Sequence, residues 1–316
     1  MRLAVIGAGG VGGLLAGLAA RAGLEVALLA RGAALEAIRA EGLQVATARE
    51  QFTVRPALVS DDPAALGPCD AVLVAVKSWQ VAALAPSLRP LVAPGGLVVP
   101  LQNGVEAAER LAAGLPGVRV AGGVTFVFAW SEGPGRIRNA GPPLQVTMGE
   151  RPGAPLAGAL GPLAAALGGA GITASVSEAI DVVAWEKLLF VAPFGAVGAV
   201  SRAPAGVIRE TAETRRLFSG LVLEGAAVAR ARGVPLSEDV LARTLDRLDG
   251  VAREATVSMH RDLAAGRPSE LLDQTGAVVR LGAASGVAVP LHEALLAALL
   301  PLERAARGEA SQFRPT

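Results

Sequence analysis

A glycine-rich loop at the N-terminus constrains the fold most strongly. The chain begins MRLAVIGAGGVGGLLAG, so an apolar run leads directly into the pattern GxGxxG and then into a helix-forming stretch. In such a strand–loop–helix unit, the glycines allow a tight turn, close approach of a pyrophosphate, and packing of helix on strand. The helix N-terminus adds free N–H groups and partial positive charge. The sequence therefore predicts dinucleotide binding by the loop of Gly7, Ala8, Gly9, Gly10, Val11 and Gly12; an unliganded glycine-rich turn is the alternative.

The same segment imitates a signal peptide or a membrane span, because residues 3–20 are uncharged and mostly apolar. Six glycines within it argue against one continuous helix. The single cysteine, Cys69, cannot form an internal disulfide and precedes a predicted buried strand, so we expect it to be inert. We therefore expect a cytoplasmic protein without a membrane segment, and the net charge of +1 gives no drive toward nucleic acid.

The order of predicted elements indicates two domains, as a chain of 316 residues suggests. Short apolar runs alternate with helical patterns up to residue 126, which predicts a parallel sheet flanked by helices. GRIRNAG and LQVTMGE predict short antiparallel strands at the edge of this sheet, and ITASVS a last strand. Helical stretches then follow, around residues 180–192, 204–232, 236–264, 268–286 and 291–308. We expect a Rossmann-type domain over residues 1–172 and an all-α domain over residues 173–316.

The residue after the second predicted strand bears on the cofactor. NAD sites usually have an acid there for the ribose hydroxyls, whereas this chain has Arg31 in LLARG. An arginine pairs with a 2′-phosphate, so Arg31 favours NADP(H); an ordinary surface arginine is the alternative. Lys77 ends the apolar run 70–77, at the sheet edge where ligands bind, and can add positive charge near the same cofactor.

Several motifs in a fixed order carry a family resemblance. They are the glycine loop, Arg31, VKSWQ at 76–80, LQNGV at 101–105, WEKL at 185–188 and SMHRDLAAGRPSE at 258–270. Together they resemble the ketopantoate reductase family, whose members reduce 2-dehydropantoate to pantoate with NADPH in pantothenate and coenzyme A biosynthesis. The resemblance runs from residue 1 to about residue 300. It implies an NADP-dependent oxidoreductase with a Rossmann domain, a helical domain and an active site in the cleft between them.

The resemblance also assigns roles to residues. The glycine loop, Arg31, Lys77, Gln80 and Asn103 would contact the cofactor, with Asn103 at the junction of nicotinamide and substrate. Lys187 would be the catalytic lysine. Ser258 and Glu270 would bind the 2-keto acid substrate. The oligomeric state stays open, a homodimer being one possibility.

Lys187 is unusual in this chain because arginine accounts for 27 of the 29 basic residues and Lys77 is the only other lysine. Hydride reduction of a ketone leaves negative charge on oxygen, which needs a proton and a nearby positive charge. Arginine cannot release a proton at usable pH, but a lysine desolvated by apolar neighbours can. We therefore expect Lys187 to polarise the carbonyl and donate the proton. The alternative is a lysine whose stem covers apolar surface while its head stays in water.

The chain departs from the family pattern after the lysine. Val191 and Gly195 stand where the family usually has substrate-contacting asparagines, and Pro193 between them predicts a break or kink in the helix. These departures leave the identity of the keto acid open. One alternative is therefore a reductase of another 2-keto acid. A separate alternative, from a different class, is a non-catalytic NADP(H) sensor whose helical domain binds a partner.

Three further residues have structural alternatives. Glu270 follows Pro268, so we expect it at the start of a helix, where a first-turn acid is favourable without any catalytic role. His260 and His292 are the only histidines and have no metal-ligand or triad partners at useful spacing. We expect both to be structural or exposed, and no metal site.

Overall fold

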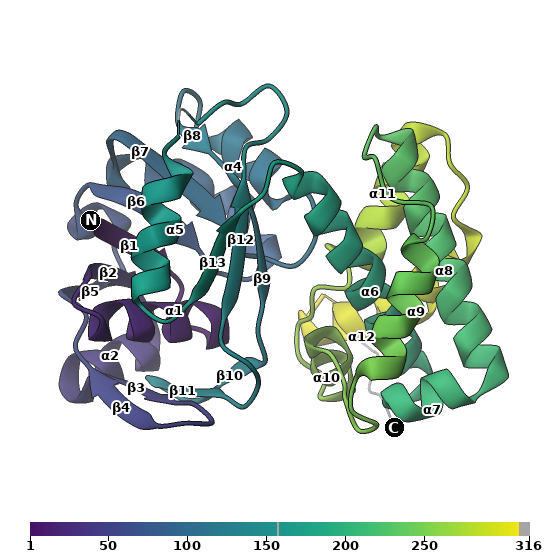
Figure 1. The fold of residues 1–316 in the computed structure, drawn as a ribbon. Coiled ribbons are helices and arrows are strands. Elements are labelled where there is room, and N and C mark those ends of the chain that lie inside the picture. The colour runs from purple at the N-terminus through teal and green to yellow at the C-terminus, as the bar shows by residue number, and fades with distance from the viewer. Residues whose placement is uncertain (157, 310–316) are drawn as a thin grey trace. The chain divides into compact units, whose positions relative to one another are not determined.

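The chain divides into two units (Figure 1). Clusters of buried hydrophobic side chains lie on both faces of the first unit's main sheet, and a separate cluster lies in the second unit. The computed structural model describes residues 1–156 and 158–309. The first unit comprises Met1–Gln102 and Glu106–Ile180; the second comprises Asn103–Val105 and the described residues from Asp181 onward. The boundary expected from the sequence, near residue 172, precedes this division.

The first unit is an α/β structure. Its strands are β1 Arg2–Ile6, β2 Glu25–Leu29, β3 Leu43–Ala46, β4 Gln51–Val54, β5 Leu58–Ser60, β6 Cys69–Val74, β7 Val92–Pro100, β8 Arg119–Val120, β9 Gly122–Phe126, β10 Ala129–Gly133, β11 Arg136–Asn139, β12 Gln145–Gly149 and β13 Thr173–Val176. Its α-helices are α1 Gly10–Arg21, α2 Gly32–Glu41, α3 Val81–Leu84, α4 Ala107–Gly114 and α5 Leu160–Gly169. Short 3₁₀ helices cover Pro63–Leu66, Ser78–Gln80 and Ala85–Leu91.

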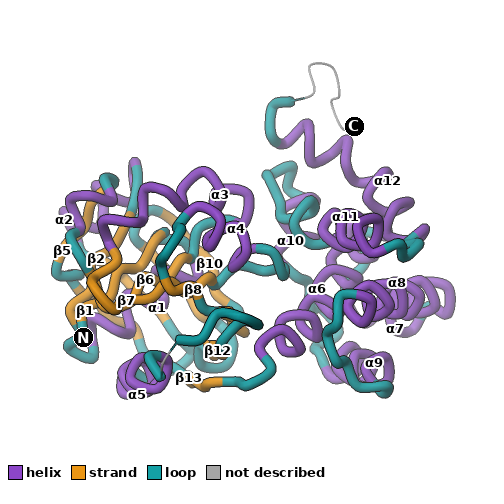
Figure 2. The backbone as a smooth tube through the Cα atoms, turned by 90° about the horizontal axis from the view of Figure 1, so that it is seen from above, coloured by secondary structure: helices purple, strands orange, loops and turns teal. Residues whose placement is uncertain are grey.

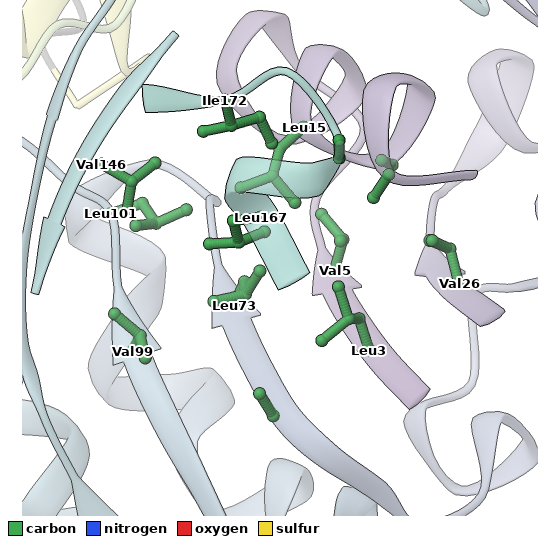
Figure 3. Close-up of a cluster of buried hydrophobic side chains, with 14 of the residues drawn as sticks. Leu3, Val5, Leu15, Val26, Leu73, Val99, Leu101, Val146, Leu167 and Ile172 are labelled. Atoms are coloured by element: carbon green, nitrogen blue, oxygen red, sulfur yellow. The ribbon is translucent and has the colours of Figure 1, made fainter. Parts of the chain in front are cut away.

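A six-stranded parallel sheet in the order β5-β2-β1-β6-β7-β8 forms the centre of this unit. Figure 2 shows helices on both sides of its strands. Both faces are buried, which is why the strands read as continuous apolar runs. Alternate residues of β1 enter different cores: Leu3 and Val5 face the side of α1 and α5, whereas Ala4 and Ile6 face the side of α3 and α4. Figure 3 shows the first of these cores. The fold class predicted from the sequence is thus confirmed.

Two smaller sheets complete the first unit. One has the order β10-β11-β3-β4, and the other the order β13-β12-β9. GRIRNAG and LQVTMGE do form strands with antiparallel partners, β11 with β10 and β12 with β9. Their expected place at the edge of the parallel sheet is wrong, because each pairs within one of these separate sheets. β13, predicted from ITASVS, pairs in parallel with β12.

Among the residues described from Asp181 onward, all regular elements are helices. They are α6 Ile180–Ser201 (which begins at the last residue of the first unit), α7 Ala205–Glu210, α8 Ala212–Ala231, α9 Val240–Gly250, α10 Ser258–Ala264, α11 Thr275–Ser285 and α12 Pro290–Ala306. The predicted stretch 204–232 divides at Thr211, whose backbone is extended, and 236–264 divides after Gly250. The helical second half is confirmed, with more helix ends than the sequence suggested.

Helix α6 crosses the core of the second unit and runs on through Pro193, so the expected break is wrong. A proline removes one backbone hydrogen bond, but its neighbours Phe190 and Phe194 are 7% and 1% exposed, and their burial offsets the loss. By length and composition α6 could also span a membrane. Because 67% of its most apolar window is buried inside the protein, it is better described as a core helix.

Candidate active site

The glycine loop between β1 and α1 has the geometry that its sequence predicts. Gly7 has φ +110°, a conformation that favours glycine, and a Cβ there would lie 3.1 Å from Val76. A Cβ on Gly12 would overlap the carbonyl oxygen of Gly7, so this glycine lets α1 pack tightly on the loop. A Cβ on Gly9 would meet nothing within 4 Å. A Cβ on Gly10 would lie 2.6 Å from Ala129 O, so close packing requires glycine at positions 7, 10 and 12, whereas Gly9 opens onto free space.

The N-terminus of α1 suits an anion. Gly9 is the N-cap residue and offers no side-chain hydrogen bond to the first turn, which contains no acidic residue. The N–H groups of this turn therefore keep their capacity for an external acceptor, and the helix dipole favours negative charge there. A dinucleotide pyrophosphate fits this loop, with Gly9 allowing close backbone approach.

Arg31 follows β2 by two residues and is the N-cap residue of α2, with an exposed side chain. β2 is the neighbour of β1 in the sheet, and the two strands run parallel, so Arg31 lies at the same sheet edge as the glycine loop. The backbone N–H of Gly7 donates to Leu29 O at 3.0 Å, which fixes the loop against the end of β2. A guanidinium here can reach toward a phosphate on the adjacent ribose.

Lys77 and Gln80 form a compact turn after β6. Gln80 N donates to Lys77 O at 2.9 Å, and Gln80 Oε1 accepts from Lys77 N at 3.2 Å. The ammonium of Lys77 lies 5.7 Å from the ring centroid of Trp79. The structure therefore shows Gln80 shaping the turn that carries Lys77, while cofactor contacts by either residue stay a prediction.

Lys187 lies in the first half of α6, among buried apolar side chains. It is itself only 8% exposed, and Trp185, Leu188 and Leu189 beside it are 3% exposed or less. Burial lowers the pKa of Lys187 from 10.5 to about 8, because desolvation disfavours the ammonium. The carboxylate of Glu270 opposes this shift in pKa, and the guanidinium of Arg247 adds to it. An amine with this pKa can change its charge near neutral pH. Because Lys187 is buried, the alternative of a head group that stays in water does not describe it.

Glu270, 6% exposed, is held by two side-chain amides. Its Oε2 accepts from Asn103 Nδ2 at 3.0 Å and from Gln274 Nε2 at 3.5 Å. The next residue, Gly104, has φ +103°, and a Cβ there would lie 2.7 Å from Asp273 O, so glycine allows the segment to approach the Glu270 turn closely. The second unit thus brings together Asn103, Lys187 and Glu270, three of the residues that the sequence singled out.

The expected placement of Glu270 at a helix start is wrong. Helix α11 begins only at Thr275, and residues 271–274 form a turn in which Asp273 N and Gln274 N donate to Glu270 O. Leu271 N donates to the Ser269 hydroxyl at 3.2 Å, which diverts the chain from a helix that Pro268 could have opened. The first-turn explanation for the acid therefore falls away.

Ser258 is the first residue of α10 and is half-buried. Its role in substrate binding stays a prediction. The next residue, Met259, packs on α6, where a Cβ on Gly195 would overlap its side chain. Two turns after Lys187 on α6, Gly195 therefore offers no polar side chain and packs against an apolar one.

Both histidines are buried, so of the two expected alternatives, structural or exposed, the structural one applies. His292 is 2% exposed, and its Nδ1 lies 2.9 Å from Glu224 Oε2. Burial lowers the pKa of both His260 and His292. In the part of the chain that the structure describes, no cluster of three or more histidine, cysteine, aspartate or glutamate residues could hold a metal.

Comparison with known proteins decides the family. A family model described as ketopantoate reductase PanE/ApbA matches residues 3–153, and its C-terminal counterpart matches residues 179–303. The chain belongs to the ketopantoate reductase family. It is 32% identical over 296 residues to the 2-dehydropantoate 2-reductase of Halobacterium salinarum, covering 93% of this chain and 96% of that protein. It is 33% identical over 301 residues to the 2-dehydropantoate 2-reductase of Caulobacter vibrioides, which covers 94% of this chain and 97% of that protein.

Solved structures agree with this assignment. The crystal structure of a PanE/ApbA family ketopantoate reductase from Ralstonia eutropha has a TM-score of 0.88 and 33% identity, and covers 97% of this chain and 100% of its own. A D-mandelate dehydrogenase solved with NADH and anilino(oxo)acetate has the same TM-score, with 97% and 99% coverage. Its identity is only 21%, so it shows the shared fold. The chain is an oxidoreductase of the ketopantoate reductase family.

Three further residues, not singled out from the sequence, contact or act on the predicted site residues or the segment beside them. Gln102 is 6% exposed, and its Nε2 donates to Val74 O at 2.8 Å and Val76 O at 2.9 Å, binding the end of β6 to the LQNG segment. Gln274 donates to Glu270, and Arg247 lowers the pKa of Lys187. The LQNG motif contains Gln102 and could have indicated it, whereas Gln274 and Arg247 lie in no motif.

Proposed function

We propose that this chain reduces the 2-oxo group of 2-dehydropantoate to pantoate with NADPH. The observation that carries the proposal is the buried Lys187, with a pKa of about 8, beside the Glu270 carboxylate that accepts from Asn103. Matched relatives named 2-dehydropantoate 2-reductase over more than 90% of the chain support the substrate.

The chemistry assigned to Lys187 follows from its environment. Below about pH 8 the ammonium is the main form, so it can donate a hydrogen bond to a carbonyl oxygen and make the carbon more electrophilic. As negative charge develops on that oxygen, the ammonium transfers its proton and returns to the neutral amine. The glycine loop would hold a reduced nicotinamide cofactor, which would supply the hydride when bound.

Glu270 and Asn103 serve the same lysine. The carboxylate of Glu270 raises the pKa of Lys187 against the effect of burial, which keeps more of the amine protonated near neutral pH. Asn103 donates to that carboxylate and so fixes its position. An ammonium held in place stabilises developing negative charge without reorganisation.

NADPH is the cofactor that we propose, because Arg31 occupies the end of β2 and exposes its guanidinium there. A 2′-phosphate is the group on NADPH that an arginine at this position can bind. The D-mandelate dehydrogenase neighbour was solved with NADH, which makes a direct comparison of the two cofactors necessary.

A second candidate is reduction of another, more apolar 2-keto acid. Val191 and Gly195 provide no polar group on α6, and Met259 fills the space beside Gly195. A non-catalytic NADP(H) sensor remains a third reading, against which the buried lysine and its carboxylate partner argue.

Consumption of NADPH or NADH with a panel of 2-keto acids tests these readings. The panel contains 2-dehydropantoate and branched and aromatic 2-keto acids of similar size. We expect the highest kcat/KM for 2-dehydropantoate with NADPH. A higher kcat/KM for an apolar keto acid would favour the second candidate, and binding of NADPH without turnover of any keto acid would favour the sensor.

The lysine is tested by Lys187→Arg with Lys77→Arg as its matched control, since these are the chain's two lysines. Arginine keeps the charge but cannot release a proton. We expect Lys187→Arg to lose about 10²–10⁴-fold in kcat, the usual contribution of general acid catalysis, while NADPH binding is kept. Lys77→Arg should retain most of kcat. If Lys187→Arg stayed within a few-fold of the parent, the proton would come from elsewhere.

Two expectations about the protein as a whole accompany the proposal. We expect it to work in a reducing cytoplasm, where the buried thiol of Cys69 stays free. A homodimer is a further expectation, which light scattering would test.

A further inference from the structure

The turn that carries Glu270 is fastened to the last helix by a buried carboxylate. Glu303 of α12 has 0% exposure, although it stands in a sequence, PLERAARGE, that reads as a solvent-exposed helix end. Its carboxylate accepts from Ser269 N at 3.1 and 3.0 Å and from Ser269 Oγ at 2.5 Å. A buried carboxylate needs such partners, because an ion left unpaired in the interior costs several kcal/mol.

Arg307, one turn further along, completes the cluster. Its Nε donates to Glu303 Oε1 at 2.6 Å, and its NH2 donates to Ser269 O at 3.0 Å. The N–H, C=O and hydroxyl of Ser269 are thus all bonded to the end of α12, and the hydroxyl also accepts from Leu271 N. Glu270 lies between these two fixed residues, so its backbone has little freedom.

From this geometry we propose that Glu303 is a positioning residue: through Ser269 it holds the Glu270 carboxylate at the place where it contacts Asn103 and acts on Lys187. The inference rests on the proposed role of Lys187 in the reaction. It assigns to α12 a part in catalysis that neither a motif nor the spacing in the sequence indicates.

Among the described residues, the carboxylate of Glu270 raises the pKa of Lys187, and the guanidinium of Arg247 on α9 lowers it. If the 269–270 turn loosens, the first effect weakens and the second remains. The pKa of Lys187 then falls, and less of the amine is protonated at neutral pH. A residue that only stabilised the fold would leave this pKa unchanged in molecules that are folded.

The variants separate positioning from folding. Ser269→Ala removes the hydroxyl bonds and leaves the Glu303–Arg307 ion pair in place. The double variant Glu303→Gln with Arg307→Gln removes both charges together, so that no buried ion loses its partner. Glu224→Gln is the matched control: Glu224 accepts from Leu291 N, His292 N and His292 Nδ1 at the other end of α12.

Lysine labelled with ¹³C at Cε gives two signals in this chain, one for each lysine, and Lys77→Arg assigns them. We expect the Lys187 signal to titrate near pH 8 in the parent and at lower pH in Ser269→Ala and the double variant, by about one pH unit where Glu270 turns away. We expect kcat/KM to fall about tenfold to a hundredfold, as for a misplaced catalytic group, with the Kd for NADPH unchanged. Glu224→Gln should lower only Tm.

The outcomes are distinct. Folded Ser269→Ala and double variants whose Lys187 titrates as in the parent would overturn the positioning role, whatever their activity. An equal fall in the pKa of Lys187 in Glu224→Gln would overturn it as well, since the effect would then be a general loosening of α12. The titration needs no substrate. If the parent protein reduced no keto acid, the proposed function would be refuted, but the titration would still test the positioning role of Glu303.

Discussion

Replacing Lys187 with methionine should stabilise the protein at neutral pH while abolishing its activity. The lysine has a pKa of about 8 when folded and 10.5 as its ordinary value. Below pH 8 both states carry the ammonium, and the folded state bears the full cost of burying it. The difference between the two pKa values corresponds to about 3 kcal/mol. Methionine has a similar length and no charge, so it avoids this cost.

The sign of the pH dependence follows from proton binding. Between about pH 8 and pH 10.5 the unfolded chain binds more protons at this site than the folded protein, so the lysine's contribution to stability rises with pH. Lys187→Met has no such site. Its advantage over the parent should therefore shrink by roughly 3 kcal/mol as the pH is raised across this window.

Urea denaturation of parent and variant at several pH values, from about 7 to 10.5, measures this difference. Glu270 loses its cation in the variant but keeps the amides of Asn103 and Gln274, so the absolute gain is smaller than the pH-dependent part. Lys77→Met, at a partly buried lysine in a turn, is the control and should show no comparable convergence with the parent. A difference between Lys187→Met and the parent that stayed constant with pH would refute the buried-amine reasoning.

Other substitutions test the cofactor site and the pH profile. Arg31→Ala should weaken NADPH binding roughly ten- to a hundredfold and leave NADH binding almost unchanged, as measured by fluorescence titration; equal losses for both cofactors would contradict a 2′-phosphate contact. Gly12→Ala should lower the free energy of unfolding by about 1–3 kcal/mol, because its Cβ overlaps Gly7 O, whereas Gly9→Ala should keep Tm and lose cofactor affinity. In the reduction direction kcat should fall as pH rises through about 8, where Lys187 loses its proton, and a flat profile there would exclude it as the acid.

The sequence predicted the inner strands of the central sheet well because burial on both faces makes them apolar throughout, whereas the edge strand β5, with one exposed and one half-buried residue, was not predicted. Strands without that signature escaped. β4 reads QFTV and β10 reads AWSEG, with mostly exposed or half-buried residues, and their pairing depends on partners distant in the chain. β3 pairs with β11 more than 90 residues later, so no local pattern could define that sheet.

The site was predictable where chemistry restricts the residue type. The rarity of lysine singled out Lys187, and glycine spacing singled out the loop. The bond between Asn103 and Glu270 joins residues 167 positions apart and exists only once the chain is folded. Glu303 was hidden for a different reason: with Arg307 it forms an ordinary i,i+4 pair, and only burial under the Ser269 turn distinguishes it from a surface ion pair.

The two kinds of cation in this chain are used for different chemistry. Arg215 donates two parallel hydrogen bonds, of 2.6 and 2.7 Å, to the carboxylate of Asp249. Arg209 donates to three backbone carbonyls at the end of α9. Both tasks use the planar, multiply donating guanidinium and need no change of charge. At position 187 the side chain is buried, its pKa is pulled toward neutrality, and a carboxylate limits that shift. A guanidinium there would stay charged at every accessible pH, whereas the amine of lysine can give up a proton and take it back.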